Sequence, residues 1–200
     1  MSATVITTLP RMGRWEPAAA ERLQHAALEL FARQGYERTT AAEIAQSVGL
    51  SERTFFRHFA DKREVLFRGQ DEFEAAFLEG LAAVPADAPA MAAVAAAVRA
   101  GAAWFVDERR DHSRLRQVVI DANPPLLERE RHKMAGLATS LASALRERGV
   151  TEPAATLAAE SGATVFGIAF GLWIGEGEQR SLREIADSVL AELAAVTGTP

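Results

Sequence analysis

Residues 39–66 contain polar side chains whose types and spacing suit contact with DNA. Arginine can form two hydrogen bonds to the edge of a guanine. Threonine can bind a phosphate or contact a thymine methyl group, and histidine can donate to a phosphate. These side chains alternate with three phenylalanines that we expect to anchor a helix, Phe55, Phe56 and Phe59. The candidate DNA contacts are Thr40, Arg53, Thr54, Arg57, His58 and Lys62.

Short helices must position these side chains, and the sequence contains the signals for them. Thr40, followed three residues later by Glu43, forms a capping box that predicts a helix beginning at Ala41. Gly49 supplies the left-handed residue that ends such a helix, and Ser51 can cap a second helix. A short helix, a glycine turn and another short helix are the layout of a helix-turn-helix, which places one helix in the DNA major groove.

A third helix is predicted to follow directly. Asp61 and Glu64 form a further capping box, which predicts a helix that begins at Lys62 and continues to about Ala83. Thr40 and Lys62 would then both stand at helix N-termini, where backbone N–H groups favour an anion. Solvated polar faces of small helices are the alternative interpretation of the same residues.

The chain resembles the TetR family of bacterial transcriptional repressors from Leu23 to about Leu66. The resemblance implies that Thr40 meets a phosphate, that Thr54 faces the groove on the recognition helix, and that Lys62 caps a backbone contact. It also implies an all-α fold, dimers built from the last two helices, and a ligand site in the rest of the chain. The similar segments are residues 26–36, 39–45, 48–51, 54–59 and 61–66.

Two residues depart from the pattern of the family. Arg53 stands where the family often has Gly or Pro, and Phe56 stands where it often has Tyr. Phenylalanine lacks the hydroxyl that usually donates to a phosphate there. Arg53 adds a charge that could replace this contact or read a base.

The charge distribution is compatible with DNA binding by the N-terminal part alone. The net charge of the 200 residues is −5. Residues 1–70 hold ten Lys and Arg against eight Asp and Glu, whereas residues 71–200 hold twelve against nineteen. The chain has no cysteine, which excludes a disulfide framework and fits a cytoplasmic protein.

We expect three regions. Residues 1–15 are predicted to form a disordered arm without a signal peptide, in which Arg11 and Arg14 could reach a neighbouring groove. Residues 16–62 form the helix-turn-helix domain, and residues 63–200 form a helical body for ligand binding and dimerisation. The helices expected in the body after about Ala83 span residues 89–108, a short stretch to about 122 with Leu115, Val118 and Val119 inward, 125–148, 153–174 and 181–195.

The helix near residues 153–174 is apolar on most sides and rich in small residues. Such a helix must be covered on most sides, and a two-fold partner can provide the cover. A fully internal core helix is the alternative. Its most apolar stretch, residues 161–175, is shorter than the roughly 20 residues of a membrane span, so no membrane partner is expected. The residues predicted for dimerisation are Gly162, Phe166, Gly167, Phe170 and Gly171.

Large aromatic side chains and flexible methionine side chains in the body suggest a mostly apolar small-molecule site. Ordinary core packing is the alternative for each of them. The residues predicted to contact a ligand are Phe77, Trp104, Phe105, Arg116, Met134 and Trp173.

The sequence shows no pattern for catalysis or metal binding. The four histidines have no metal-ligand spacing, and no Ser, His and Asp set is recognisable. We therefore expect no enzyme, no cofactor and no metal site. The mixed charges of residues 128–133 are typical of an exposed helix face.

These observations together predict a homodimeric transcriptional regulator that binds operator DNA and acts as a repressor. A small, largely apolar ligand would release it by favouring another spacing of the two DNA-binding heads. The alternatives are a helical small-molecule-binding protein whose head no longer reads DNA, supported by Phe56 and the acidic net charge, and an all-α enzyme.

Overall fold

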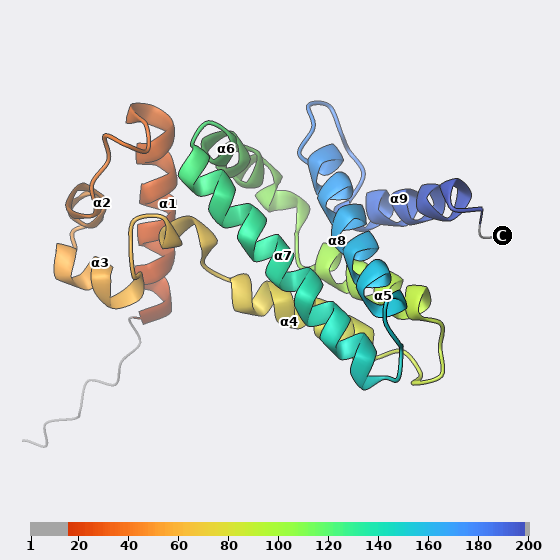
Figure 1. Ribbon diagram of the computed structural model, residues 1–200. Helices are drawn as coiled ribbons and strands as arrows, with labels where there is room; N and C mark the ends of the chain where they lie inside the picture. The colour runs from red at the N-terminus through yellow and green to blue at the C-terminus, as the bar shows by residue number, and fades with distance from the viewer. Residues whose placement is uncertain (1–15, 199–200) are drawn as a thin grey trace, which may run out of the picture. The chain divides into compact units, whose positions relative to one another are not determined.

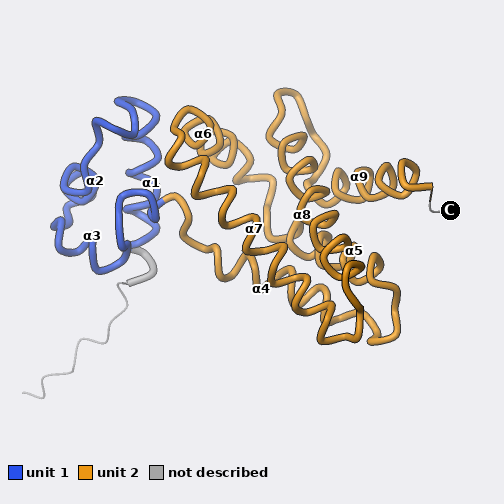
Figure 2. The backbone as a smooth tube through the Cα atoms, viewed as in Figure 1, with its two compact units in different colours: residues 1–65 blue, residues 66–200 orange. Residues whose placement is uncertain are grey.

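The computed structural model describes residues 16–198, and these residues form only helices and turns (Figure 1). The predicted all-α fold is therefore confirmed for this part of the chain. The chain divides into two compact units, residues 1–65 and residues 66–200 (Figure 2). The predicted arm of residues 1–15, with Arg11 and Arg14, lies outside the described residues.

The first unit consists of α1 (Glu16–Gln34), α2 (Ala41–Ser47) and α3 (Glu52–His58), which pack on one another. Apolar residues three or four positions apart on α1 meet the short apolar faces of α2 and α3. The residues that this packing buries completely include Leu23, Ala27, Ile44, Ala45 and Phe55.

The predicted continuous helix from Lys62 to Ala83 is wrong. A 3-10 turn, η1 (Glu64–Phe67), precedes the separate helix α4 (Gln70–Ala82). The Asp61 carboxylate accepts hydrogen bonds from the backbone N–H groups of Arg63, at 2.7 Å, and Glu64, at 3.1 Å. These hydrogen bonds form a local turn. Gly69 then adopts a left-handed conformation with φ +86°, which interrupts any α-helix at that point.

The second unit continues with α5 and five further helical segments. Helix α5 ends at Ala103, earlier than predicted, and a 3-10 turn carries the chain into α6. The capping box of Ser181 and Glu184 is present at the start of α9. The segments are α5 (Ala90–Ala103), η2 (Asp107–Arg109), α6 (Arg110–Asp121), α7 (Pro124–Glu147), α8 (Ala154–Trp173) and α9 (Leu182–Val196).

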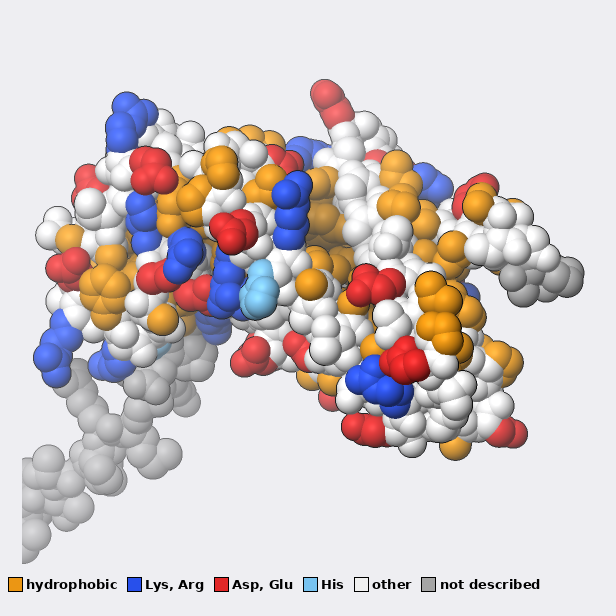
Figure 3. All heavy atoms as spheres, in the orientation of Figure 1, with side chains coloured by type: hydrophobic (Ala, Val, Ile, Leu, Met, Phe, Trp, Pro, Cys, Tyr) orange, Lys and Arg blue, Asp and Glu red, His pale blue; other side chains and the backbone are white. Residues whose placement is uncertain are grey.

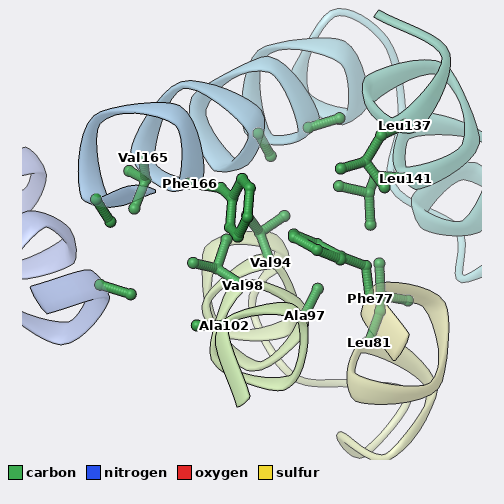
Figure 4. Close-up of a cluster of buried hydrophobic side chains, with 14 of the residues drawn as sticks. Phe77, Leu81, Val94, Ala97, Val98, Ala102, Leu137, Leu141, Val165 and Phe166 are labelled. Carbon is green, nitrogen blue, oxygen red and sulfur yellow. The ribbon is translucent and has the colours of Figure 1, made fainter. Parts of the chain in front are cut away.

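The core of the second unit lies between α4, α5, α7, α8 and the first turns of α9 (Figure 4). Helix α5 packs against α4, α8 and α9, and α8 packs against α7 and α9. The approach of α4 to α5 is close at Gly101, where a Cβ atom would lie 1.8 Å from the Phe77 ring. Glycine is therefore needed there to let the Phe77 ring lie against the α5 backbone.

The prediction that Leu115 and Val118 point inward on α6 is also wrong. Their exposed fractions are 38% and 61%. Val119 is buried as predicted, and helix α6 also buries Ile120 and Arg110, so a polar side chain helps to decide which face of this helix is inward.

Helix α8 is, by length and composition, the one described helix able to cross a membrane unaided. The helix has 20 residues and is therefore longer than its most apolar stretch, residues 161–175. Eight of its residues are buried in the second unit. The apolar residues on the buried side of α8 are thus explained by the place of this helix in the core.

Candidate nucleic-acid interface

Thr40 and Glu43 form the predicted capping box at the start of α2. The Glu43 backbone N–H donates to the Thr40 hydroxyl at 3.1 Å, and the Thr40 backbone N–H donates to the Glu43 carboxylate at 2.8 Å. The Thr40 hydroxyl also donates to this carboxylate at 2.9 Å. Hydrogen bonds from Thr40, first from its backbone, stabilise the charged carboxylate and lower the pKa of Glu43. The exposed Thr40 hydroxyl is thereby held in one orientation.

The turn between α2 and α3 has the geometry that the glycine predicts. Gly49 has φ +72°, and the Leu50 N–H donates to the Ala45 carbonyl at 2.9 Å, as in a Schellman motif. Ser51 then caps α3 by accepting a hydrogen bond from the Thr54 N–H at 3.2 Å. The capping and the turn fix the direction in which α3 leaves α2.

Helix α3 buries one side in the first unit and exposes the other. Phe55 is completely buried. Because an α-helix has about 3.6 residues per turn, Arg53 and Arg57 project from the opposite side, and both are exposed. Thr54 is half-buried on one flank of the arginines. Phe56, which we expected to be an anchor, lies on the other flank with an exposed fraction of 51%.

The remaining two predicted DNA contacts, His58 and Lys62, are held against other residues. The Lys62 ammonium donates to the Tyr36 carbonyl at 2.7 Å and lies 4.0 Å from the centre of the Tyr36 ring. Lys62 does not begin a helix, because η1 begins at Glu64. The His58 Nε2 atom is buried and has no hydrogen-bond partner among the described residues.

Comparison with known proteins identifies this arrangement. Residues 23–68 match the model of the bacterial regulatory proteins of the tetR family. The HTH-type transcriptional regulator TcmR of Streptomyces glaucescens is 45% identical over 80 residues. This match covers 40% of this chain and 35% of TcmR, so it spans about a third of that relative's length. Residues 23–68 thus form a DNA-binding domain of the TetR family.

Solved structures extend the similarity to the whole TetR fold. A chain from Syntrophomonas wolfei, described as a TetR-family transcriptional regulator, has a TM-score of 0.65 at 15% identity and aligns over 91% of this chain and 96% of its own. The fatty acid degradation regulator FadR of Bacillus halodurans has a TM-score of 0.58 at 17% identity, over 90% and 96% of the two chains. At these identities the similarity establishes the fold alone.

Four of the predicted ligand contacts belong to a cluster of aromatic rings in the second unit. Phe77 and Trp173 are completely buried, Phe105 is half-buried, and Trp104 has an exposed fraction of 39%. The ring of Phe105 lies 5.0 Å from that of Trp104 and 5.8 Å from that of Trp173. The cluster reaches Phe77 through Phe73, whose ring lies 4.9 Å away. The half-buried Met134 packs against the same core.

Arg116 does not join the aromatic cluster in the way we expected. Its Nε donates to the Leu66 carbonyl at 2.9 Å, and its Nη1 pairs with the Glu130 carboxylate at 2.8 Å. Its guanidinium carbon lies 5.2 Å from the centre of the Phe67 ring. Arg116 therefore ties α6 to α7 and to the segment that leads into α4. The contact with Leu66 joins residues 50 positions apart, so a short-range sequence pattern does not reveal it.

Two of the predicted dimerisation residues face the core of their own unit. Gly162 is buried, and a Cβ atom there would lie 2.5 Å from the Val94 side chain. Phe166 is also buried, with its ring 5.2 Å from that of Phe77. The small residue at 162 thus permits contact between α8 and α5 within the chain.

The opposite side of α8 is exposed and mostly apolar, with Glu160 and Thr164 among its polar residues. Gly167 and Gly171 are exposed with nothing within 4 Å of a Cβ atom, and Phe170 is half-buried. Apolar side chains reach the surface along α8 and α9 (Figure 3). We call this surface the α8 apolar face. Its exposed large side chains are Leu157, Ile168 and Leu172.

The sequence did not indicate one polar network, which joins the start of α6 to the end of α8. The Trp173 Nε1 donates to the Asp107 carboxylate at 3.0 Å, and Arg110 pairs with the same carboxylate at 2.7 Å. Arg110 also donates to the Arg180 carbonyl at 2.6 Å and to the Glu178 carbonyl. Residues of this network line a surface hollow of about 370 Å³, and none of the six predicted ligand contacts lines it.

Proposed function

We propose that this TetR-family transcriptional regulator is a cytoplasmic repressor that binds a two-fold-symmetric operator as a homodimer. The observation that carries the proposal is α3, a capped helix after a glycine turn that presents Arg53 and Arg57 away from the buried Phe55. Two exposed arginines one helical turn apart can follow the floor of a major groove and form paired hydrogen bonds with guanine edges.

The other polar residues of the first unit would place α3 on the duplex. Thr54 is suited to phosphate, because a hydroxyl group at the start of a short helix can donate to its oxygens. The Thr40 hydroxyl would donate to a phosphate only after releasing the Glu43 carboxylate, to which it already donates. His58 would reach a phosphate only after its buried Nε2 turned outward. Lys62 would act mainly by holding Tyr36, because its ammonium already donates to that carbonyl.

The α8 apolar face is the surface we propose for dimerisation. A symmetric partner would cover Leu157, Ile168 and Leu172, and the two exposed glycines would let the helices approach closely. A dimer would present two copies of α3. Their spacing must match about 34–36 Å, one turn of the duplex.

An apolar effector would enter the second unit beside Trp104 and Phe105, where the aromatic cluster meets the surface. Phe77, Met134 and Trp173 would form the inner wall after the rings moved apart. The effector would weaken DNA binding by its preference for another arrangement of the heads, with a coupling of about 1–3 kcal/mol, and DNA would weaken effector binding equally. A change in Trp104 fluorescence would report the effector, and a Trp104→Phe variant would identify the signal.

Binding to selected and random duplexes tests the DNA proposal. The purified protein should enrich a palindromic sequence from a random library and bind it far more tightly than random DNA at 150 mM salt, on the order of 10³-fold or more. Arg53→Ala should cost about 1–3 kcal/mol and relax the preference at one position of each half-site.

An arginine far from α3 in the sequence provides the control. Arg131→Ala removes an exposed arginine of α7, and it should leave affinity and preference unchanged. Equal affinity of the wild-type protein for selected and random duplexes would contradict the regulator proposal.

A further inference from the structure

Phe56 is a large apolar side chain on the exposed side of α3. Its exposed fraction is 51%, whereas Phe55 is completely buried and Phe59 has an exposed fraction of 5%. Its ring meets the edge of Phe55 at 5.4 Å between centroids. The other side of the ring is free to meet a partner.

The surroundings of Phe56 fit a nucleic-acid partner. Arg53 lies one helical turn before it, Arg57 follows it, and both are exposed. Cationic side chains on the same exposed surface attract an anionic polymer. Phe56 would therefore lie against the duplex whenever the two arginines contact it.

A phenylalanine ring has a restricted choice of contacts on DNA. It has no donor for a phosphate oxygen, and an apolar ring against a phosphate would strip water from the charge without replacing its hydrogen bonds. The thymine C5-methyl group is the apolar feature of the major groove, and phenylalanine side chains contact it. An apolar contact at this position is also selective, because the other three bases present no methyl group there.

We propose that Phe56 packs against a thymine methyl group in each half-site and thereby determines the preference for that base pair. This inference rests on the proposed DNA binding by α3. Arg53 and Arg57 would recognise bases by hydrogen bonds. Phe56 would add an apolar contact that recognises the thymine methyl group.

Removal of a single methyl group from the DNA tests the contact. Each thymine of the operator enriched by the wild-type protein is replaced in turn by deoxyuridine, which keeps the base pairing and lacks the methyl group. At one thymine position of the half-site, replacement by deoxyuridine in a single half-site should weaken wild-type binding about fourfold. This is the value expected for one buried methyl-sized group. Replacement in both half-sites should weaken binding about fifteenfold if the two sites are independent.

The variant Phe56→Ala should bind the thymine and deoxyuridine operators equally. Phe56→Leu should retain part of the difference, because an apolar side chain remains. Arg57→Ala is the matched control on the same helix, and it should weaken binding to both operators by the same factor. Thermal unfolding should show that Phe56→Ala folds normally, since the side chain is half exposed.

The possible outcomes separate this inference from the proposed function. Suppose that the wild-type protein enriches an operator, but that no deoxyuridine replacement weakens its binding more than it weakens the binding of Phe56→Ala. The proposed DNA binding then stands, and the Phe56 inference fails. An operator without thymine in its half-sites also overturns it. A uniform loss across all sequences for Phe56→Ala would assign the ring to the sugar–phosphate backbone instead. If no sequence is enriched, the proposed function and this inference both fail.

Discussion

Asp107 shows how one exposed carboxylate can organise buried groups around it. Its side chain accepts from the indole of the completely buried Trp173 and from Arg110. These hydrogen bonds, the one from Trp173 first, lower the pKa of Asp107 below its usual value near 3.8. They stabilise the folded state only while the carboxylate is charged.

Removal of this carboxylate should destabilise the second unit. Asp107→Ala leaves the Trp173 indole N–H without its acceptor, and we expect a loss of about 1–3 kcal/mol in the free energy of unfolding. Asp111→Ala is the control, because the side chain of Asp111 is 92% exposed in its pair with Arg114, and it should cost less than about 1 kcal/mol. Urea unfolding at pH 7 measures both values. Equal losses would contradict this role for Asp107.

The same carboxylate should make the stability depend on acidity. Because its pKa is lower in the folded state, its contribution is complete above the unfolded pKa near 3.8 and is lost as the pH falls through the folded value. Asp107→Asn removes this titration. Between pH 5 and pH 3 the wild-type protein should lose more stability than the variant, as measured by urea unfolding at each pH. Parallel losses would indicate that Asp107 titrates normally.

At the scale of elements, two helix glycines differ in what surrounds them. A Cβ atom at Gly101 of α5 would lie 1.8 Å from the Phe77 ring, whereas a Cβ atom at Gly136 of α7 would have nothing within 4 Å. Glycine is thus required by packing at the first position. At the second it only weakens the helix, since alanine has the higher helix propensity.

These two positions should respond to alanine in opposite directions. Gly101→Ala should destabilise the protein by about 1–3 kcal/mol, because the Phe77 ring must move within a packed core. Gly136→Ala should stabilise it by about 0.5–1 kcal/mol. Thermal unfolding of the two variants beside the wild-type protein checks both signs. Stabilisation by Gly101→Ala would show that α4 and α5 do not pack as described.

At the scale of the whole molecule, the α8 apolar face is the surface through which we propose that two copies of the chain form a dimer. Gly167→Leu places a large side chain on this face, where it would hold two α8 helices apart. We expect the dimer to dissociate at micromolar concentration, as measured by light scattering. Dissociation of the dimer should also weaken binding to a palindromic operator, because one DNA-binding head alone makes half of the contacts.

Gly136→Leu is the matched control for this prediction. Both glycines are exposed within a helix and have nothing within 4 Å of a Cβ atom, so leucine should be tolerated equally by the fold. A dimer lost in both variants would indicate general destabilisation. A monomeric wild-type protein would exclude the α8 apolar face as a dimer interface.

The sequence by itself determined the features that depend on neighbouring residues. The capping box at Thr40 and the left-handed turn at Gly49 appear as predicted. Each is a contact between groups within a few positions of one another, so residue type and spacing were enough to predict it. The similar pattern at Asp61 and Glu64 predicted a helix where the structure has a 3-10 turn. The similarity of residues 23–68 to the TetR family extended these local features to a fold.

Only the tertiary structure decided which faces are buried and which charges are paired. Helix α8 is apolar on most sides, so its pattern could not show that Gly162 faces α5 while Gly167 faces solvent. Arg110 and Arg116 take carbonyl partners 50 or more positions away. Contacts of this kind depend on how distant helices pack, and periodicity along one helix carries no information about its partner.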